Sequence, residues 1–110
     1  MNKILSATSG PIGTLTFNNP ERHNAMSLDM WRASAAALQQ FEQDPVVRVI
    51  VVTGAGGKAF VSGADISKFE SERATLDAVG EYNAAVDRFS QALGESSKPT
   101  IAMIRGYCLG

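Results

Sequence analysis

The stretch Lys58–Glu70, KAFVSGADISKFE, is the part of the sequence that best distinguishes an ordinary turn from a site where another group approaches the backbone. It follows the apolar run RVIVVTG and places Ser62, Gly63 and Ala64 directly before Asp65. Residues this small either form an ordinary turn or allow another group to approach the backbone closely. The rest of the sequence has to decide between the two.

The composition is that of an ordinary water-soluble globular domain. The chain has 110 residues, of which 45% are hydrophobic and 19% charged, and its formal net charge is −1. The length predicts at most one domain, and balanced charge without a basic run argues against a nucleic-acid partner. No apolar run approaches the length of a membrane span. Because the single cysteine, Cys108, can form no internal disulfide, we expect a reducing compartment and a cytoplasmic location.

Apolar patterns of two periods alternate along the chain and predict an α/β fold with a mostly parallel sheet. Strands are expected at Ile4–Leu5, Ile12–Phe17, Val46–Val52 and Thr100–Ile104. Helices are expected from Leu28 to Asp44–Pro45 after an N-cap at Ser27, over a short segment from Ser67, and from Leu76 to Gly94 after an N-cap at Thr75.

Two of these elements carry more detailed expectations. The strand Val46–Val52 is apolar on both faces except for Arg48, so it is expected to be covered on both sides and to pair in parallel. In the last helix, the residues expected on the inward face, because they lie at helical spacing, are Leu76, Val79, Asn83, Val86, Phe89 and Leu93.

A nucleotide site is disfavoured. Gly54–Ala59 fits the loose glycine pattern of a dinucleotide loop, but such a loop must open into a helix. Here Phe60–Gly63 is typical of an extended piece and a second turn. A Walker phosphate loop is excluded because Ala59 follows Lys58 where Ser or Thr is required.

Side-chain chemistry has little support elsewhere. His23 is the single histidine and has no ligand spacing to Cys108, so no metal site is predicted. No nucleophile elbow accompanies the Ser, His and Asp residues. Asp65 is expected to cap or to hydrogen-bond the backbone rather than to move protons.

Backbone N–H groups are the remaining candidates for chemistry. A helix start after Gly63–Ala64 would present unsatisfied amides, as an oxyanion hole requires. Gly106–Gly110 is expected to form another strand-to-helix glycine turn. Two such turns at the ends of neighbouring strands could direct two amides at one oxygen, and two ordinary turns stay the alternative.

Three motifs then occur in order: PERHNAM at 20–26, FVSGADI at 60–66, and KPTIA at 98–102 followed by RGYCLG at 105–110. With them the sequence resembles, over essentially its whole length, the crotonase superfamily of enoyl-CoA hydratase/isomerase proteins. The resemblance implies an α/β spiral of repeated ββα units and assembly as homotrimers or hexamers. Residues 1–110 are expected to be the N-terminal portion of one such domain, cut at the glycine turn at Gly110.

The resemblance also implies a coenzyme A thioester as substrate, with no separate cofactor because coenzyme A is part of the substrate. It implies that the Ala64 N–H is one oxyanion-hole donor and that Gly110 begins the turn supplying the second. The implied substrate contacts are Arg22, His23, Ala25, Ser62, Asp65, Ile66 and Phe69.

The expected reaction of the full-length parent is hydration of a 2-enoyl-CoA. Isomerases, dehalogenases, decarboxylases and thioester hydrolases share the hole and stay alternatives, as does a non-catalytic acyl-CoA-binding or interaction protein of this fold. In the resembled family the acid–base glutamates lie beyond the position of Gly110. The 110-residue chain by itself is therefore predicted to be inactive.

Overall fold

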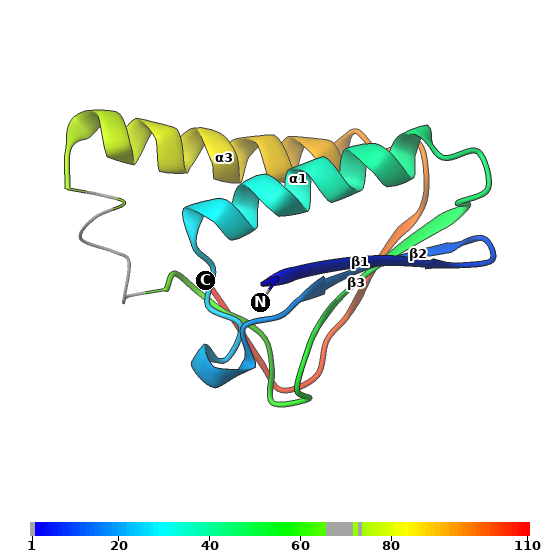
Figure 1. The fold of residues 1–110 in the computed structure, drawn as a ribbon, viewed down its shortest axis with the longest axis horizontal. Coiled ribbons are helices and arrows are strands. Elements are labelled where there is room, and N and C mark those ends of the chain that lie inside the picture. The colour runs from blue at the N-terminus through cyan, green and yellow to red at the C-terminus, as the bar shows by residue number, and fades with distance from the viewer. Residues whose placement is uncertain (1, 66–71, 73) are drawn as a thin grey trace.

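The computed structural model describes residues 2–65, 72 and 74–110 (Figure 1). Its elements are β1 (Ile4–Ser9), β2 (Ile12–Phe17), the 3₁₀ helix η1 (Pro20–Arg22), α1 (Leu28–Gln43), β3 (Val49–Gly54), β4 (Ala59–Ser62), α3 (Leu76–Gly94), β5 (Thr100–Met103) and β6 (Tyr107–Leu109). The predicted α/β class is confirmed. The short helix expected from Ser67 lies outside the described residues.

The strands form two sheets. The larger has the order β1-β2-β3-β5, and the smaller pairs β4 with β6. β1 and β2 form an antiparallel hairpin, whereas β2, β3 and β5 run parallel to one another, as the sequence predicts. β4 and β6 are also parallel. The carboxyl ends of β2, β3 and β5 therefore lie at one edge of the larger sheet, where ligands commonly bind in open α/β sheets.

Both long helices cover the same face of the larger sheet and lie side by side (Figure 1). The predicted N-caps are confirmed, because the Ser27 hydroxyl accepts from the Met30 N–H and the Thr75 hydroxyl from the Ala78 N–H. A Cβ on Gly13 would lie 2.9 Å from the Phe41 ring, so glycine lets α1 settle on β2. The buried core consists of Leu15, Phe17, Met26, Met30, Ala35, Ala37, Leu38, Phe41, Val47, Ile50, Val52 and Phe89.

The expected coverage of both faces of β3 is wrong for the described part of the chain. Ile50 and Val52 are buried beneath the helices, but Val49 and Val51 on the opposite face are only half-buried. The strand also begins later than expected, because the Asp44 carboxylate accepts from the Val46 N–H in a turn. One face of the sheet thus stays partly open.

The predicted inward face of α3 is confirmed at Phe89, which is buried, and wrong at Leu76 and Asn83, which are exposed. Leu76 is 91% exposed, and the buried side chains are Tyr82, Ala85 and Phe89. The helix is oriented so that the Tyr82 hydroxyl accepts a hydrogen bond from the Trp31 Nε1–H on α1, at 3.1 Å. A polar contact between the helices therefore accompanies the apolar face.

The expected glycine turn into a helix at Gly106–Gly110 is also wrong. Tyr107–Leu109 forms β6, and the Tyr107 N–H donates to the Lys58 carbonyl at 3.1 Å beside β4. Gly106 has φ of 74°, and a Cβ there would lie 1.9 Å from the Lys58 carbonyl oxygen. The glycine therefore serves close strand pairing, because its backbone must lie against that of Lys58.

Candidate functional site

Three segments meet beyond the carboxyl ends of β2 and β3. They are the loop 18–27 that follows β2, the stretch 62–65 that follows β4, and the end of β6 at Gly110. They contain the motifs from which the sequence predicted an oxyanion hole. Segments far apart in the chain are thus brought together here.

Ala64 is held by its neighbours in sequence rather than by its own amide. It forms a parallel bridge with Met26, in which the Met26 N–H donates to the Gly63 carbonyl at 2.7 Å. The Asp65 N–H donates to the Met26 carbonyl at 2.8 Å. Among the backbone hydrogen bonds of the described residues, none uses the Ala64 N–H. Because a strand alternates its amides, that N–H points away from Met26.

The second predicted turn lies against the first. Gly110 has φ of 86°, and a Cβ on it would lie 2.7 Å from the Gly63 Cα. Gly63 itself has φ of 99°, a conformation that other residues rarely adopt. Although 106–109 is not the turn that was expected, the two glycine-containing strand ends are adjacent.

Arg22 and His23 lie at the exposed end of η1, next to these glycines. His23 has φ of 52°, and its ring centroid lies 5.7 Å from that of Tyr107 on β6. The Arg22 Nε lies 4.0 Å from a carboxylate oxygen of Asp65, and 52% of the Arg22 side chain is exposed. The site therefore offers a cation and two rings to solvent. The ring of Tyr107 was missed by sequence reasoning, which assigned its segment to a turn.

The other predicted contacts hold the loop together. The Ser62 hydroxyl donates to the Arg22 carbonyl at 3.2 Å, and Ala25 is buried. The Asp65 carboxylate is 1% exposed and accepts from the Asn19 Nδ2 at 3.4 Å, so it bonds a side chain in addition to lying near Arg22. Ile66 and Phe69 lie outside the described residues. The substrate contacts implied for these residues stay predictions.

Sequence reasoning also missed the two buried asparagines of the loop. Asn24 is 0% and Asn19 is 3% exposed, and each uses its side-chain amide in several hydrogen bonds. For Asn24 the residue type was a signal of the backbone conformation, because asparagine tolerates the left-handed region and Asn24 has φ of 59°. The Asn24 amide also explains why the glycine pattern at 54–59 begins with a residue that has no side chain. A Cβ on Gly54 would lie 2.7 Å from the Asn24 Nδ2 and 2.4 Å from the Ala59 carbonyl oxygen.

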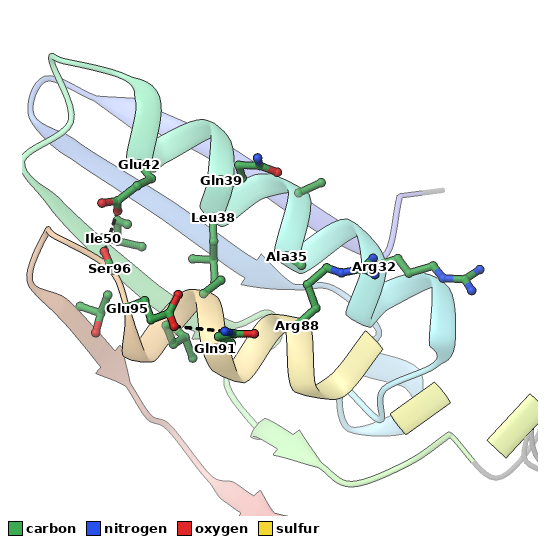
Figure 2. A pocket seen from close by; sticks show the side chains of 14 residues that line it. Arg32, Ala35, Leu38, Gln39, Glu42, Ile50, Arg88, Gln91, Glu95 and Ser96 are labelled. Carbon is green, nitrogen blue, oxygen red and sulfur yellow. Dashed lines mark hydrogen bonds between the residues drawn. The ribbon is translucent and has the colours of Figure 1, made fainter. Parts of the chain in front are cut away.

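A groove of about 610 Å³ lies between α1 and α3, away from these loops (Figure 2). Ala35, Leu38 and Ile50 supply apolar lining, with Arg32 and Glu42 among its charged residues. The groove reaches the amino ends of β3 and β5, because its lining residues Ile50 and Thr100 form the first pair between those strands. It is therefore at the opposite edge of the sheet from Ala64.

Other classes of site find no support in the part of the chain described here. Within residues 2–65, 72 and 74–110, no three His, Cys, Asp or Glu side chains gather as a metal site would need. Over the same residues, no helix has the length and apolar content that crossing a bilayer requires.

Comparison with known proteins identifies the surrounding fold. The family model for enoyl-CoA hydratase/isomerase matches residues 7–110. The mitochondrial 3-hydroxyisobutyryl-CoA hydrolase of Homo sapiens is 35% identical over 109 residues, which cover 98% of this chain and 28% of that protein. The short-chain-enoyl-CoA hydratase of Clostridium acetobutylicum is 30% identical over 110 residues, covering 100% of this chain and 41% of that protein.

A solved structure agrees in three dimensions. An enoyl-CoA hydratase/isomerase family protein from Hyphomonas neptunium superposes with a TM-score of 0.94 at 37% sequence identity. The match covers 99% of this chain and 42% of that one. The described α/β arrangement is therefore the N-terminal portion of the crotonase fold, as the resemblance implied.

The chain spans about 28% to 42% of the length of these proteins. The name of the human relative places that protein in the mitochondrion. The cytoplasmic location expected from the sequence stays a prediction.

Proposed function

This chain belongs to the enoyl-CoA hydratase/isomerase family, and we propose from that premise that it binds an acyl-CoA thioester and polarises the thioester carbonyl with backbone amides. The observation that carries the proposal is the Met26–Ala64 bridge. The two hydrogen bonds of the bridge use the Gly63 carbonyl and the Asp65 N–H, so the Ala64 N–H points away from Met26. A preorganised N–H of this kind is what an oxyanion hole requires.

The chemistry needs two donors for one oxygen. When a nucleophile adds to a 2-enoyl thioester at C3, the electron pair of the double bond moves toward the carbonyl oxygen and gives an enolate. Hydrogen bonds from fixed amides stabilise that charge more than they stabilise the neutral ground state. In our proposal the Ala64 N–H is one donor and the glycine turn starting at Gly110 supplies the other. The contact between Gly110 and Gly63 supports this, because it brings the two chain segments together.

The coenzyme A portion would lie over the exposed side of the loop. Arg22 offers a cation for a phosphate group, and His23 follows it in the chain. Ser62 and Ala25 are proposed to lie along the bound thioester, and Ile66 is assigned to the same path on the sequence motif alone. We propose that Asp65 acts through Arg22, since its carboxylate is buried beside the Arg22 Nε. Phe69 is proposed to line the acyl pocket, on the sequence motif alone.

Hydration of a 2-enoyl-CoA is the reaction we propose for the full-length protein. The clostridial relative, named as a short-chain-enoyl-CoA hydratase, supports it. A second candidate is hydrolysis of a 3-hydroxyacyl-CoA thioester, supported by the human relative's name and its 35% identity. Both reactions place negative charge on the thioester oxygen, and they differ in the groups that move protons.

Two further parts of the proposal concern the whole protein. The acid–base groups are proposed to come from residues that follow Gly110 in longer family members, so the 110-residue chain by itself should bind thioesters without turning them over. Assembly as a homotrimer or hexamer, and a cytoplasmic location, are proposed for the full-length protein as well.

Calorimetry with two matched ligands tests the proposal. Butyryl-CoA has the thioester carbonyl, and S-butyl-CoA is the thioether that lacks it. We expect butyryl-CoA to bind about threefold to tenfold more tightly, which is what one hydrogen bond contributes. Equal affinities of the two ligands would refute the oxyanion hole. If neither ligand binds, the coenzyme A site is refuted.

A further inference from the structure

Two buried asparagines close the loop that carries Arg22 and His23. The Asn19 N–H donates to the Asn24 Oδ1 at 2.8 Å, and the Asn24 N–H donates to the Asn19 carbonyl at 2.8 Å. The two residues therefore hold each other by reciprocal hydrogen bonds. Neither side chain can contact a ligand directly, because Asn24 is 0% and Asn19 is 3% exposed.

The Asn24 amide ties this loop to the start of β4. Its Nδ2 donates to the Ala59 carbonyl at 2.8 Å and to the Ala55 carbonyl at 3.0 Å. Both of its donor hydrogens are thus used, and its oxygen accepts from Asn19. Ala59 is the first residue of β4, the strand that leads into Gly63 and Ala64. Asn24 therefore fixes the chain on the N-terminal side of Ala64.

The Asn19 amide ties the loop to both neighbours of the Met26–Ala64 bridge. Its Nδ2 donates to the Ala25 carbonyl at 3.0 Å, directly before Met26, and to the Asp65 carboxylate at 3.4 Å, directly after Ala64. Its Oδ1 accepts from the Lys3 ammonium at 3.3 Å. Asn19 therefore fixes the chain on the C-terminal side of Ala64 and on the opposing strand.

We infer that Asn24 and Asn19 are positioning residues for the Ala64 N–H. They hydrogen-bond Ala59, Asp65 and Ala25, and none of these hydrogen bonds uses Ala64, whose N–H is left for a ligand. A buried, fully satisfied polar network is rigid and specifies one arrangement of the backbone around it. The inference rests on the proposed function, because the network affects substrate binding only if the Ala64 amide binds the thioester oxygen.

Two substitutions each break one part of the network. Asn24→Asp keeps the shape and tolerates a φ of 59°, but it faces the Ala55 and Ala59 carbonyls with oxygen in place of NH₂. Asn19→Ala removes the donors to Ala25 and Asp65 and leaves the Asn24 donors in place. The matched control is Asn18→Ala, whose side chain makes an exposed hydrogen bond to the Asn2 carbonyl.

The first readout is the ratio of affinities for butyryl-CoA and S-butyl-CoA. In Asn24→Asp and Asn19→Ala we expect the thioester preference to fall to nearly one, while the affinity for S-butyl-CoA changes less than twofold. Asn18→Ala should keep both values. A preference retained within twofold by either folded variant overturns the inference. So does a parallel loss of affinity for the thioether, since that marks general damage to the surface.

The second readout needs no ligand and separates this inference from the proposed function. Amide hydrogen exchange at Met26 and Asp65 reports the two bonds of the bridge, and we expect it to speed up at least tenfold in Asn24→Asp and Asn19→Ala. Unchanged exchange would show that the asparagines position nothing. If the wild-type chain shows no thioester preference, the proposed function fails, while faster exchange still establishes the positioning. Should Asn24→Asp not fold, Asn19→Ala carries both readouts under the same criteria.

Discussion

Two polar networks connect distant segments at opposite edges of the larger sheet, and they are built differently. At the carboxyl ends of the parallel strands, the Asn19–Asn24 network is buried and centred on two uncharged amides. At the amino ends, the Glu42 network joins α1 to the segment before β5 and is more open to solvent. There the Glu42 carboxylate accepts from the Ser96 hydroxyl (Figure 2). It also accepts from the hydroxyl and the N–H of Ser97.

The Glu42 network also completes the end of a helix. The Lys98 ammonium donates to the Phe41 and Asp44 carbonyls at the C-terminus of α1, where a cation is favourable. The networks at the two edges therefore have different roles. The Glu42 network contributes to stability and depends on pH, whereas the asparagine network fixes backbone geometry mainly through hydrogen bonds between amides and backbone carbonyls.

The largest effect is expected from a substitution in the candidate site. Ala64→Pro removes the proposed donor N–H, and it leaves both bridge hydrogen bonds in place because those use Gly63 and Asp65. The thioester preference of the chain should vanish. In a full-length enzyme, turnover should fall by about 10²–10³, the usual effect of losing one oxyanion donor. The measurement is the ligand affinity ratio, or the steady-state rate where turnover exists.

Ala64→Gly keeps the N–H and is the matched control. It should retain the preference that Ala64→Pro loses. A folded Ala64→Pro protein with the wild-type preference would remove Ala64 from the site and leave the buried network without a function.

The second prediction concerns the support beneath the site and uses two glycines with the same φ of 74°. Gly106→Ala places a Cβ 1.9 Å from the Lys58 carbonyl oxygen, whereas a Cβ on Gly57 meets nothing within 4 Å. Backbone strain of about 1–3 kcal/mol is common to both variants. Gly106→Ala should therefore lower the free energy of unfolding, measured in urea, by clearly more than Gly57→Ala does. Equal losses would mean that β4 and β6 do not pair as described.

The third prediction tests the charged network. Hydrogen bonds from the Ser97 hydroxyl, the Ser97 N–H and the Ser96 hydroxyl, and the nearby Lys98 charge, hold the pKa of Glu42 at about 2 rather than 4.5. Because the pKa is lower in the folded chain, the stabilisation is complete above about pH 4.5. It is lost as the pH falls from there through about 2. Urea unfolding at several pH values should show this loss.

Glu42→Gln should lower stability near neutral pH and flatten the curve between pH 4.5 and 2. Ser97→Ala should flatten it partly, since it removes the first of the hydrogen bonds to Glu42. Gln39→Ala, on the same helix, is the control and should keep the wild-type curve. A Glu42→Gln chain with an unchanged pH curve would show that the network does not stabilise the fold.

The smallest effect is expected for Cys108→Ser. Cys108 is exposed on β6 and has no role in either network. Ligand affinities and the urea midpoint should stay within experimental error of the wild type. Loss of thioester binding would mean that the thiol belongs to the site.

Local patterns predicted the regular elements well. Caps at Ser27 and Thr75 and the parallel apolar strands depend on nearby residues, and each is confirmed. The segment 106–110 was misjudged because its pairing with β4, whose residues lie 47 or 48 positions earlier in the chain, is a contact that no local pattern reveals. The open face of β3 was missed for the same reason, since periodicity shows an apolar side chain but not what covers it.

The place of the candidate site was predicted in part, and the roles of its residues stay proposals. The motifs located the backbone groups of Gly63 and Ala64, because small residues before an acidic one suggest close approach. The asparagines were missed because a buried amide in a polar loop is indistinguishable, in sequence, from a solvated one. Only the fold shows that Asn24 reaches Ala59.

The central claim is that the Ala64 N–H receives the thioester oxygen, and one measurement addresses that atom directly. In a ¹H–¹⁵N spectrum of the labelled chain, the Ala64 signal is followed during titration with butyryl-CoA and, separately, with S-butyl-CoA. We predict a large downfield proton shift at Ala64 with the thioester and a small one with the thioether, while signals near Arg22 respond equally to both. An Ala64 signal that responds identically to the two ligands would contradict the account.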